Sequence, residues 1–210
     1  NSSFLQVLFR LCIPCSGTIF LDNQDYMLAG LHQLRTQMSV IPQEPFLFKA
    51  SVRDNLDPLH EHSCEEIQGV LAELKLEFLV PLLQQELEDL SSKLSAGQKQ
   101  LVCLGRAMLK HNKVVFMDEA TANVDFETDK LIHKKIEEKF QGVTVVVIAH
   151  RLRSVIRSDL IAVMEEGTCK EFAPPLDLVN NPRSLFRTMI NHCSSQESQL
   201  LFSKIKALKA

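Results

Sequence analysis

The stretch Val114-Val115-Phe116-Met117-Asp118-Glu119 decides the fold class, because an unbroken apolar run ends in two carboxylates. Such a run, without polar residues in alternation, is typical of a strand that is buried on both faces. A second apolar run occupies Val143 to Ile148, and a helical pattern at about Glu127 to Phe140 lies between the two. Strands that alternate with helices predict an α/β domain built on a parallel sheet with both faces covered.

Weaker patterns on either side of this core predict the remaining elements. Ser63 is a plausible N-cap ahead of Glu65 and Glu66, and helical spacing of apolar residues follows it. The tail after Asn191 is polar and then interleaves leucines with lysines; a surface or partner helix is one interpretation, but we favour a frayed terminus. Other helices are expected near Ser3–Leu11, Phe78–Leu87 and Ala96–Lys110, and other strands near Thr18–Leu21, Ser39–Pro42 and Leu160–Met164.

The composition narrows the class of protein. Hydrophobic residues make up 45% of the chain and charged residues 23%, which is the balance of a globular protein. The net charge of −3 gives no basis for a dedicated nucleic-acid surface, so we expect no nucleic-acid partner. No apolar run approaches the roughly 18 residues of a membrane span, and Asn1 to Cys12 lacks the pattern of a secretory signal. Scattered cysteines favour a reducing, cytosolic setting.

The two carboxylates carry the first chemical hypothesis. Asp118 and Glu119 follow an apolar strand, and ligands of parallel α/β sheets bind at the carboxyl ends of the strands. Nucleotide hydrolysis needs one carboxylate to hold Mg²⁺ and a base to orient the attacking water. Asp118 is expected in the first role and Glu119 in the second. On its own the pair is common, and an N-cap for the next helix is the competing interpretation.

The surrounding motifs favour the nucleotide. Leu94-Ser95-Ala96-Gly97-Gln98 opens a helix, where exposed backbone N–H groups, a hydroxyl and a glycine suit a phosphate. Ala120-Thr121-Ala122-Asn123-Val124-Asp125 follows the carboxylates, and Val147-Ile148-Ala149-His150-Arg151 ends the next strand. A single histidine at a strand end is usually structural, but in this order His150 is a candidate sensor of the γ-phosphate.

Taken together and in this order, the motifs resemble the nucleotide-binding domain of ABC transporters. They are most similar to the second such domain of the multidrug-resistance-protein (C) subfamily, and the resemblance covers about Asn1 to Cys193. The matches are Leu94 to Gln98 with the signature motif, Val114 to Glu119 with Walker B, Ala122 to Asp125 with the D-loop, Gln43 with the Q-loop, His150 with the switch histidine, and Leu47-Phe48 with Val52 to Pro58 for the stretch after the Q-loop.

The resemblance implies ATP and Mg²⁺ as ligands, with two cassettes closing face to face around two ATP molecules. Within its own site, Gln43 and Asp118 would hold Mg²⁺, Glu119 would act on the water and His150 on the γ-phosphate. The signature residues would instead contact ATP held by the partner domain. Residues implied in nucleotide binding, besides Gln43 and Asp118, are Ser2, Ser3, Ser95, Gly97, Gln98 and Asp125.

The implied partners are a second nucleotide-binding domain and the transmembrane domains of a transporter. The soluble chain would then be held at the cytosolic face of a membrane through domains that lie outside it. The implied fold is α/β, with a P-loop NTPase-type parallel sheet, a helical signature subdomain at about 59–105 and an incomplete N-terminal β part. We expect residues 1–193 to form a partial ATP-binding cassette and residues 194–210 a C-terminal tail.

The sequence departs from the family pattern at its start. The loop G-x-x-x-x-G-K-[ST] should precede the first helix, and alignment places Asn1 on its lysine and Ser2 on its Mg²⁺-binding hydroxyl. The glycines, their strand and the aromatic residue that stacks on adenine would lie upstream of residue 1. Asparagine cannot supply the cation that lysine offers to the phosphates.

Two smaller departures lie around the signature. Leu87 to Lys93 looks shortened, and Lys93 occupies a usually small or polar position. Gly105 replaces the family's usual alanine, which lowers helix propensity by about 1 kcal/mol.

Several functions therefore stay open. The favoured one is an ATPase domain that powers transmembrane export. The second is a degenerate or non-hydrolysing cassette that only interacts with a partner. The third, a soluble ABC protein of DNA repair or translation, is disfavoured because a coiled-coil insertion and a basic face are both lacking.

Overall fold

The computed structural model describes residues 2–85, 90–118, 124–149 and 151–207. The chain forms two compact units, Asn1–Ile148 and Ala149–Ala210. Each unit has its own buried cluster of apolar side chains, and each is described by itself below.

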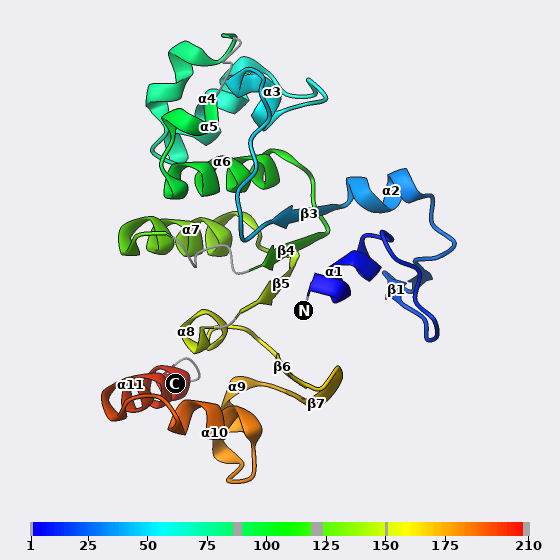
Figure 1. The fold of residues 1–210 in the computed structure, drawn as a ribbon, viewed down its shortest axis with the longest axis vertical. Coiled ribbons are helices and arrows are strands. Elements are labelled where there is room, and N and C mark those ends of the chain that lie inside the picture. Colours follow the sequence, from blue (N-terminus) through cyan, green and yellow to red (C-terminus); the bar gives the residue numbers. More distant parts are fainter. Residues whose placement is uncertain (1, 86–89, 119–123, 150, 208–210) are drawn as a thin grey trace. The chain divides into compact units, whose positions relative to one another are not determined.

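A parallel sheet lies at the centre of the first unit (Figure 1). Its strands are β3 (Met38–Ile41), β4 (Val114–Asp118) and β5 (Thr144–Ile148), in the order β3-β4-β5. Both pairings are parallel, and β4 is the central strand. The prediction of an α/β fold with a parallel sheet is therefore confirmed.

The two faces of β4 pack against different layers. Val115 and Met117 belong to the cluster formed with helices α6 (Ala96–Leu109) and α7 (Phe126–Lys139). Val114 and Phe116 belong to a second cluster, which includes Leu5 and Leu8 of helix α1 (Ser2–Leu8). Since side chains alternate along a strand, a continuous apolar run is what a strand with two buried faces requires.

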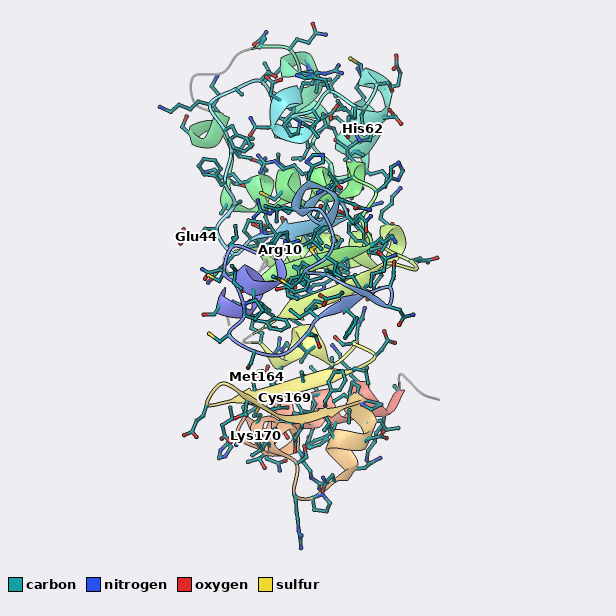
Figure 2. The ribbon with its side chains drawn as sticks, turned by 90° about the vertical axis from the view of Figure 1, so that its right-hand side faces the viewer. Arg10, Glu44, His62, Met164, Cys169 and Lys170 are labelled. Carbon is teal, nitrogen blue, oxygen red and sulfur yellow. The ribbon has the colours of Figure 1, made fainter. Side chains whose placement is uncertain are left out.

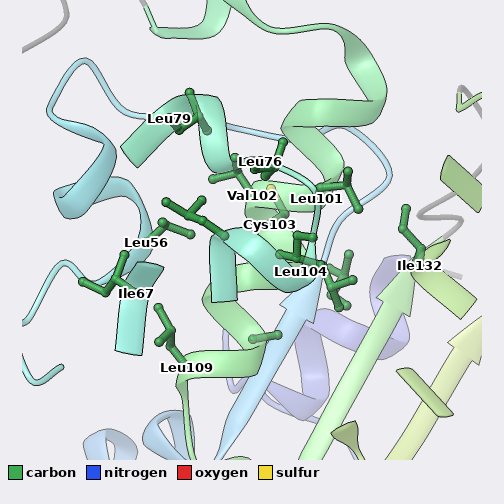
Figure 3. Close-up of a cluster of buried hydrophobic side chains, with 14 of the residues drawn as sticks. Leu56, Ile67, Leu76, Leu79, Leu101, Val102, Cys103, Leu104, Leu109 and Ile132 are labelled. Atoms are coloured by element: carbon green, nitrogen blue, oxygen red, sulfur yellow. The ribbon is translucent and has the colours of Figure 1, made fainter. Parts of the chain in front are cut away.

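A helical layer covers the outer side of α6. It consists of α3 (Val52–Leu56), α4 (Cys64–Glu73), the 3₁₀-helix η1 (Glu77–Leu82) and α5 (Leu90–Lys93). Leu56, Ile67 and Leu76 meet Val102 and Leu104 of α6 in one apolar core (Figure 3). Ser63 caps α4 through a capping box with Glu66, as the sequence predicts.

The helical stretch expected at 78–87 is present in part, as a 3₁₀-helix that ends at Leu82. Residues 77–82 form a 3₁₀-helix with Pro81 inside it. Proline lacks the N–H that an α-helix needs and clashes with the preceding turn, so an α-helix does not continue through this position. Residues 86–89 lie outside the described part of the chain.

The N-terminal segment ends its helix earlier than its apolar stripe predicts. Helix α1 stops at Leu8, and Arg10 adopts a φ of 50°. The Arg10 guanidinium donates hydrogen bonds to the carbonyl oxygens of Tyr26 and Ala29, at 3.1 and 2.6 Å. These bonds hold the turned chain against the short pair β1 (Phe20–Leu21) and β2 (Gln24–Asp25), which α2 (Leu31–Thr36) follows. The strand expected at 18–21 is thus half of an antiparallel hairpin.

The second unit is a hairpin with helices. Strands β6 (Ile161–Glu165) and β7 (Thr168–Ala173) pair antiparallel around a turn in which Glu166 and Gly167 both have positive φ. Met164, Cys169 and Lys170 mark this hairpin in Figure 2. The strand expected at 160–164 is present. The helices of this unit are α8 (Leu152–Val155), α9 (Pro175–Asn180), α10 (Leu185–Asn191) and α11 (Ser195–Ala207).

The frayed C-terminus that the sequence favours is wrong. Residues 195–207 form helix α11, in which Leu201 and Ile205 are buried in the cluster that Phe186 and Ile190 of α10 also enter. The reason is spacing: Leu201 and Ile205 are four residues apart and lie on one helix face, so they can pack together.

Packing of α11 predicts unequal effects of two neighbouring substitutions. Leu201 is 1% exposed and Leu200 is 42% exposed. Leu201→Ala is expected to lower the free energy of unfolding of the second unit by about 3 kcal/mol. Leu200→Ala, the matched control, should change it by less than about 0.5 kcal/mol. Chemical denaturation, followed through nuclear magnetic resonance signals of α10 residues, measures the free energy of unfolding of both variants. Equal effects of the two substitutions would mean that α11 does not pack against α10.

Glu171 on β7 fixes the start of α10. Its carboxylate accepts hydrogen bonds from the hydroxyl of Ser184 (2.9 Å) and the backbone N–H groups of Leu185 (2.8 Å) and Phe186 (3.1 Å). Partial burial alone would raise the pKa of Glu171, but these hydrogen bonds outweigh it and the pKa is lowered from 4.5. The contribution to stability is therefore present above pH 4.5 and is lost as the pH falls through the lower folded-state pKa.

Glu171→Gln should accordingly destabilise the second unit by about 2 kcal/mol at pH 7, because an amide cannot accept all three bonds. The difference from wild type should shrink as the pH falls below 4.5. Glu165→Gln, at an exposed position of β6, is the control and should show neither effect. A difference for Glu171→Gln that stays constant with pH would contradict this assignment.

Candidate functional site

The ends of the three parallel strands meet at one edge of the sheet. Ile41, the last residue of β3, pairs with Met117, and Asp118 pairs with Ile148, the last residue of β5. The chain therefore leaves all three strands on the same side. Gln43 follows β3 by two residues, and Asp118 is the final residue of β4.

The side chains at this edge differ in burial. Asp118 is half-buried at its strand end, whereas Gln43 is exposed. The neighbouring Glu44 is also exposed and points outward in Figure 2. Carboxylate and amide oxygens are hard donors of the kind that Mg²⁺ takes in nucleotide sites, where it keeps several waters. Gln43 and Asp118 thus fit a hydrated Mg²⁺ by donor chemistry, and the exposure of Gln43 leaves room for water.

The start of α6 is a complete helix cap. The Ser95 hydroxyl accepts a hydrogen bond from the backbone N–H of Gln98 at 3.2 Å, and the Gln98 side-chain oxygen accepts from the backbone N–H of Ser95 at 2.9 Å. Ser95 is exposed, so the end of the helix faces solvent. A long helix that begins here presents partly positive N–H groups toward any anion at its end.

The start of α7 lies directly against that of α6. Asp125 caps α7 by accepting hydrogen bonds from the N–H (3.0 Å) and the hydroxyl (2.7 Å) of Thr128, and these bonds lower its pKa. Gly97 is buried beside them: a Cβ on Gly97 would lie 3.3 Å from Thr128 and 3.4 Å from an Asp125 carboxylate oxygen. A side chain at this position would push Thr128 or Asp125 aside by a few tenths of an ångström, so glycine suits the close approach of the two helix ends.

Some expected site residues lie outside the described part of the chain. These are Glu119 and His150, the two expected catalytic residues, together with Asn1 and residues 120–123. Ser2 is the first residue of α1, but its side chain is not described; Ser3 is exposed on the same helix. The structure thus brings the strand ends that carry Gln43 and Asp118 to one edge, and the start of α6 to the start of α7.

Two residues near this site were missed by sequence reasoning. Gln100, on α6, donates from its side chain to the carbonyl oxygen of Pro42 at 2.9 Å. Arg106, also on α6, donates to the carbonyl oxygen of Phe46 at 2.7 Å. Both partners are far away in sequence, so neither spacing nor residue type signals the contact.

The other polar groups that might have held a ligand have structural partners. His60 pairs with Asp54 at 3.2 Å and His62 with Glu66 at 3.8 Å, around the starts of α3 and α4. Among the described residues, no group of three or more histidines, cysteines, aspartates or glutamates is arranged to hold a metal ion. Within the same part of the chain, no helix is both long and apolar enough to cross a membrane.

Comparisons with known proteins agree with this arrangement. Residues 1–122 match the family model described as ABC transporter. The chain is 46% identical over 210 residues to ATP-binding cassette sub-family C member 4 of Homo sapiens, covering 98% of this chain and 16% of that protein. It is 43% identical to ABC transporter C family member 5 of Dictyostelium discoideum, covering 98% of this chain and 14% of the relative.

A solved structure, that of a bacterial Atm1-family ABC exporter with ATP bound, has the same fold. It superimposes with a TM-score of 0.80 at 27% sequence identity, over 90% of this chain and 34% of the exporter chain. The chain spans 16% of the length of the mammalian C-subfamily relative. The α/β fold expected from the motifs is confirmed by this likeness.

The cap of α6 gives a prediction for stability. Ser95→Ala removes the hydroxyl that accepts from Gln98 and should lower the free energy of unfolding by about 1 kcal/mol. Ser95→Thr keeps a hydroxyl at the cap and is the control, with a smaller loss. Urea denaturation of the three proteins measures this; equal stability of the alanine variant and wild type would show that the cap contributes nothing.

Proposed function

The chain belongs to the ABC transporter family, and from that premise we propose that it binds and hydrolyses ATP as part of a nucleotide-binding domain of a C-subfamily exporter. The observation that carries the proposal is the register of β3, β4 and β5. It places Asp118 and the segment leading to Gln43 at one edge of the sheet. A triphosphate bound at that edge would lie where parallel α/β sheets take their ligands.

The chain's own residues have distinct roles in this proposal. Gln43 and Asp118 would hold the cation, which when bound would neutralise negative charge on the phosphates. Glu119, next to Asp118 in sequence, accepts a proton from the attacking water and orients it toward the γ-phosphorus. His150 donates a hydrogen bond to a γ-phosphate oxygen. Each assignment places one polar group where charge develops during phosphoryl transfer.

The start of α6 serves a second nucleotide. Ser95, Gly97 and Gln98 present a hydroxyl, a close backbone and an amide at an exposed helix start, which suits the phosphates of ATP held by a partner domain. Asp125, fixed by Thr128, lies beside Gly97 and would take part in the contact between the domains. The partners are then a second nucleotide-binding domain and transmembrane domains, which would hold the chain at the cytosolic face of a membrane.

A second candidate function is a cassette that contributes only its α6 start to a partner's nucleotide. The exposed start of α6, capped by Ser95 and Gln98, is the only part of the described chain that this candidate requires. The two candidates differ in one measurable property. Only the first requires that the chain bind Mg²⁺-ATP at its own sheet edge.

We expect calorimetric titration to detect Mg²⁺-ATP binding with a dissociation constant in the micromolar range. This corresponds to a standard binding free energy of about −8 kcal/mol. Glu119→Gln should lower ATP turnover by roughly 10²–10⁴-fold through loss of the general base. Glu65→Gln, at an exposed position of α4, is the control and should leave turnover unchanged. Absence of Mg²⁺-ATP binding by the wild-type chain would favour the second candidate, and unchanged turnover in Glu119→Gln would refute the assignment of the base.

A further inference from the structure

The loop that carries Gln43 is attached to α6 just before that residue. Gln100, on α6, is 1% exposed, and its side-chain nitrogen donates a hydrogen bond to the carbonyl oxygen of Pro42 at 2.9 Å. A buried amide without such a partner would cost free energy, so the contact fixes both groups. Pro42 immediately precedes Gln43, which means that the backbone entering Gln43 is held by a side chain of α6.

A second attachment lies just beyond Gln43. The Arg106 guanidinium donates to the carbonyl oxygen of Phe46 at 2.7 Å and to the side-chain oxygen of Asn55 at 2.8 Å, and it lies over the ring of Phe48 at 5.2 Å. Burial lowers the pKa of the Arg106 guanidinium, but a guanidinium remains charged at neutral pH. Its hydrogen bonds to oxygen acceptors are therefore charge-assisted.

Asn55 of α3 holds the end of the same loop by bonding both the backbone of Phe48 and the Arg106 guanidinium. Its side-chain oxygen accepts from the N–H of Phe48 at 2.8 Å, and its nitrogen donates to the carbonyl oxygen of Phe48 at 3.1 Å. Asn55 is fully buried. The loop from Pro42 to Phe48 is thus held at both ends, while Gln43 and Glu44 between them are exposed.

We propose that Gln100 is a positioning residue for Gln43, so that α6 places Gln43 together with the signature residues at its own start. The helix carries Gln98 at the proposed contact with a partner's nucleotide and, two residues later, Gln100 at the attachment of Pro42. The role given to Gln43 in holding Mg²⁺ rests on the proposed function; the attachment itself does not.

The competing explanation is that Gln100 only stabilises the fold, as any satisfied buried amide does. Two substitutions separate these explanations. Gln100→Met keeps a side chain of similar length in the buried position but removes the N–H donor to the Pro42 carbonyl oxygen. Leu101→Met alters the adjacent residue of α6, which is 5% exposed, and leaves the donor in place. If Gln100 has only a structural role, changes in the loop that carries Gln43 should be explained by the change in the free energy of unfolding. This should hold equally for both variants.

The first measurement needs no nucleotide. Amide hydrogen exchange of the full chain, read by nuclear magnetic resonance, reports the loop directly. In Gln100→Met the amides of Gln43 and Glu44 should exchange about five- to tenfold faster than in wild type, as expected for loss of one hydrogen bond. In Leu101→Met, compared at equal global stability, they should not. Equal exchange of these amides in Gln100→Met and wild type would overturn the proposal.

The second measurement tests the consequence for the metal. Gln100→Met should raise the Mg²⁺ concentration that half-saturates ATP binding by about fivefold, the value of one hydrogen bond between neutral groups. ATP affinity in the presence of a chelator should stay as in wild type. An unchanged Mg²⁺ requirement would overturn the positioning role. If wild type binds no Mg²⁺-ATP, the proposed function fails, and the exchange measurement alone decides whether Gln100 positions the loop.

Discussion

The parallel pairing of β4 with β3 and β5 is the constraint on which the rest of the first unit depends. It aligns Met117 with Ile41 and Asp118 with Ile148, so the chain leaves three strands at one edge. It also directs Val115 and Phe116 to opposite layers of apolar side chains. A slip of one residue would exchange these faces and carry Asp118 away from the end of its neighbour strand.

Helix α6 connects this sheet to the helical layer above it. Its apolar residues form the centre of the largest buried cluster, its capped start faces solvent, and its polar side chains hold the loop that follows β3. Local packing and site geometry are therefore not separable here. The same helix that stabilises the unit by burying Val102 and Leu104 also determines where the signature residues lie.

The sequence predicts the features that depend on local pattern. The apolar runs identify β4 and β5, the cap at Ser63 marks the start of α4, and the helix expected from about Ala96 begins there. The strand-end position of Asp118 follows from the same run. These features are predictable because buried strands and capped helices have strong residue preferences that act over a few positions.

What the sequence does not predict depends on contacts distant along the chain. Helix α11 forms because Leu201 finds partners on α10, and Gln100 acts on a carbonyl 58 positions away. Gly105 is another case: helix propensity marks it as a weakness. In the fold, however, a Cβ there would come within 2.9 Å of Leu56, so the glycine makes room for the helical layer. Here low helix propensity is outweighed by packing against residues that are distant along the chain, which a local stretch of sequence cannot reveal.

The proposed site requires Gln43 and Asp118 to hold one cation on one triphosphate. Paramagnetic broadening tests it directly, with Mn²⁺-ATP added to the isotopically labelled chain in place of Mg²⁺-ATP. The amide signals of Gln43 and Asp118 should broaden together at low Mn²⁺ concentration and recover when excess Mg²⁺ displaces the Mn²⁺. Saturation with Mn²⁺-ATP that leaves both signals sharp, or that broadens only one of them, would contradict it.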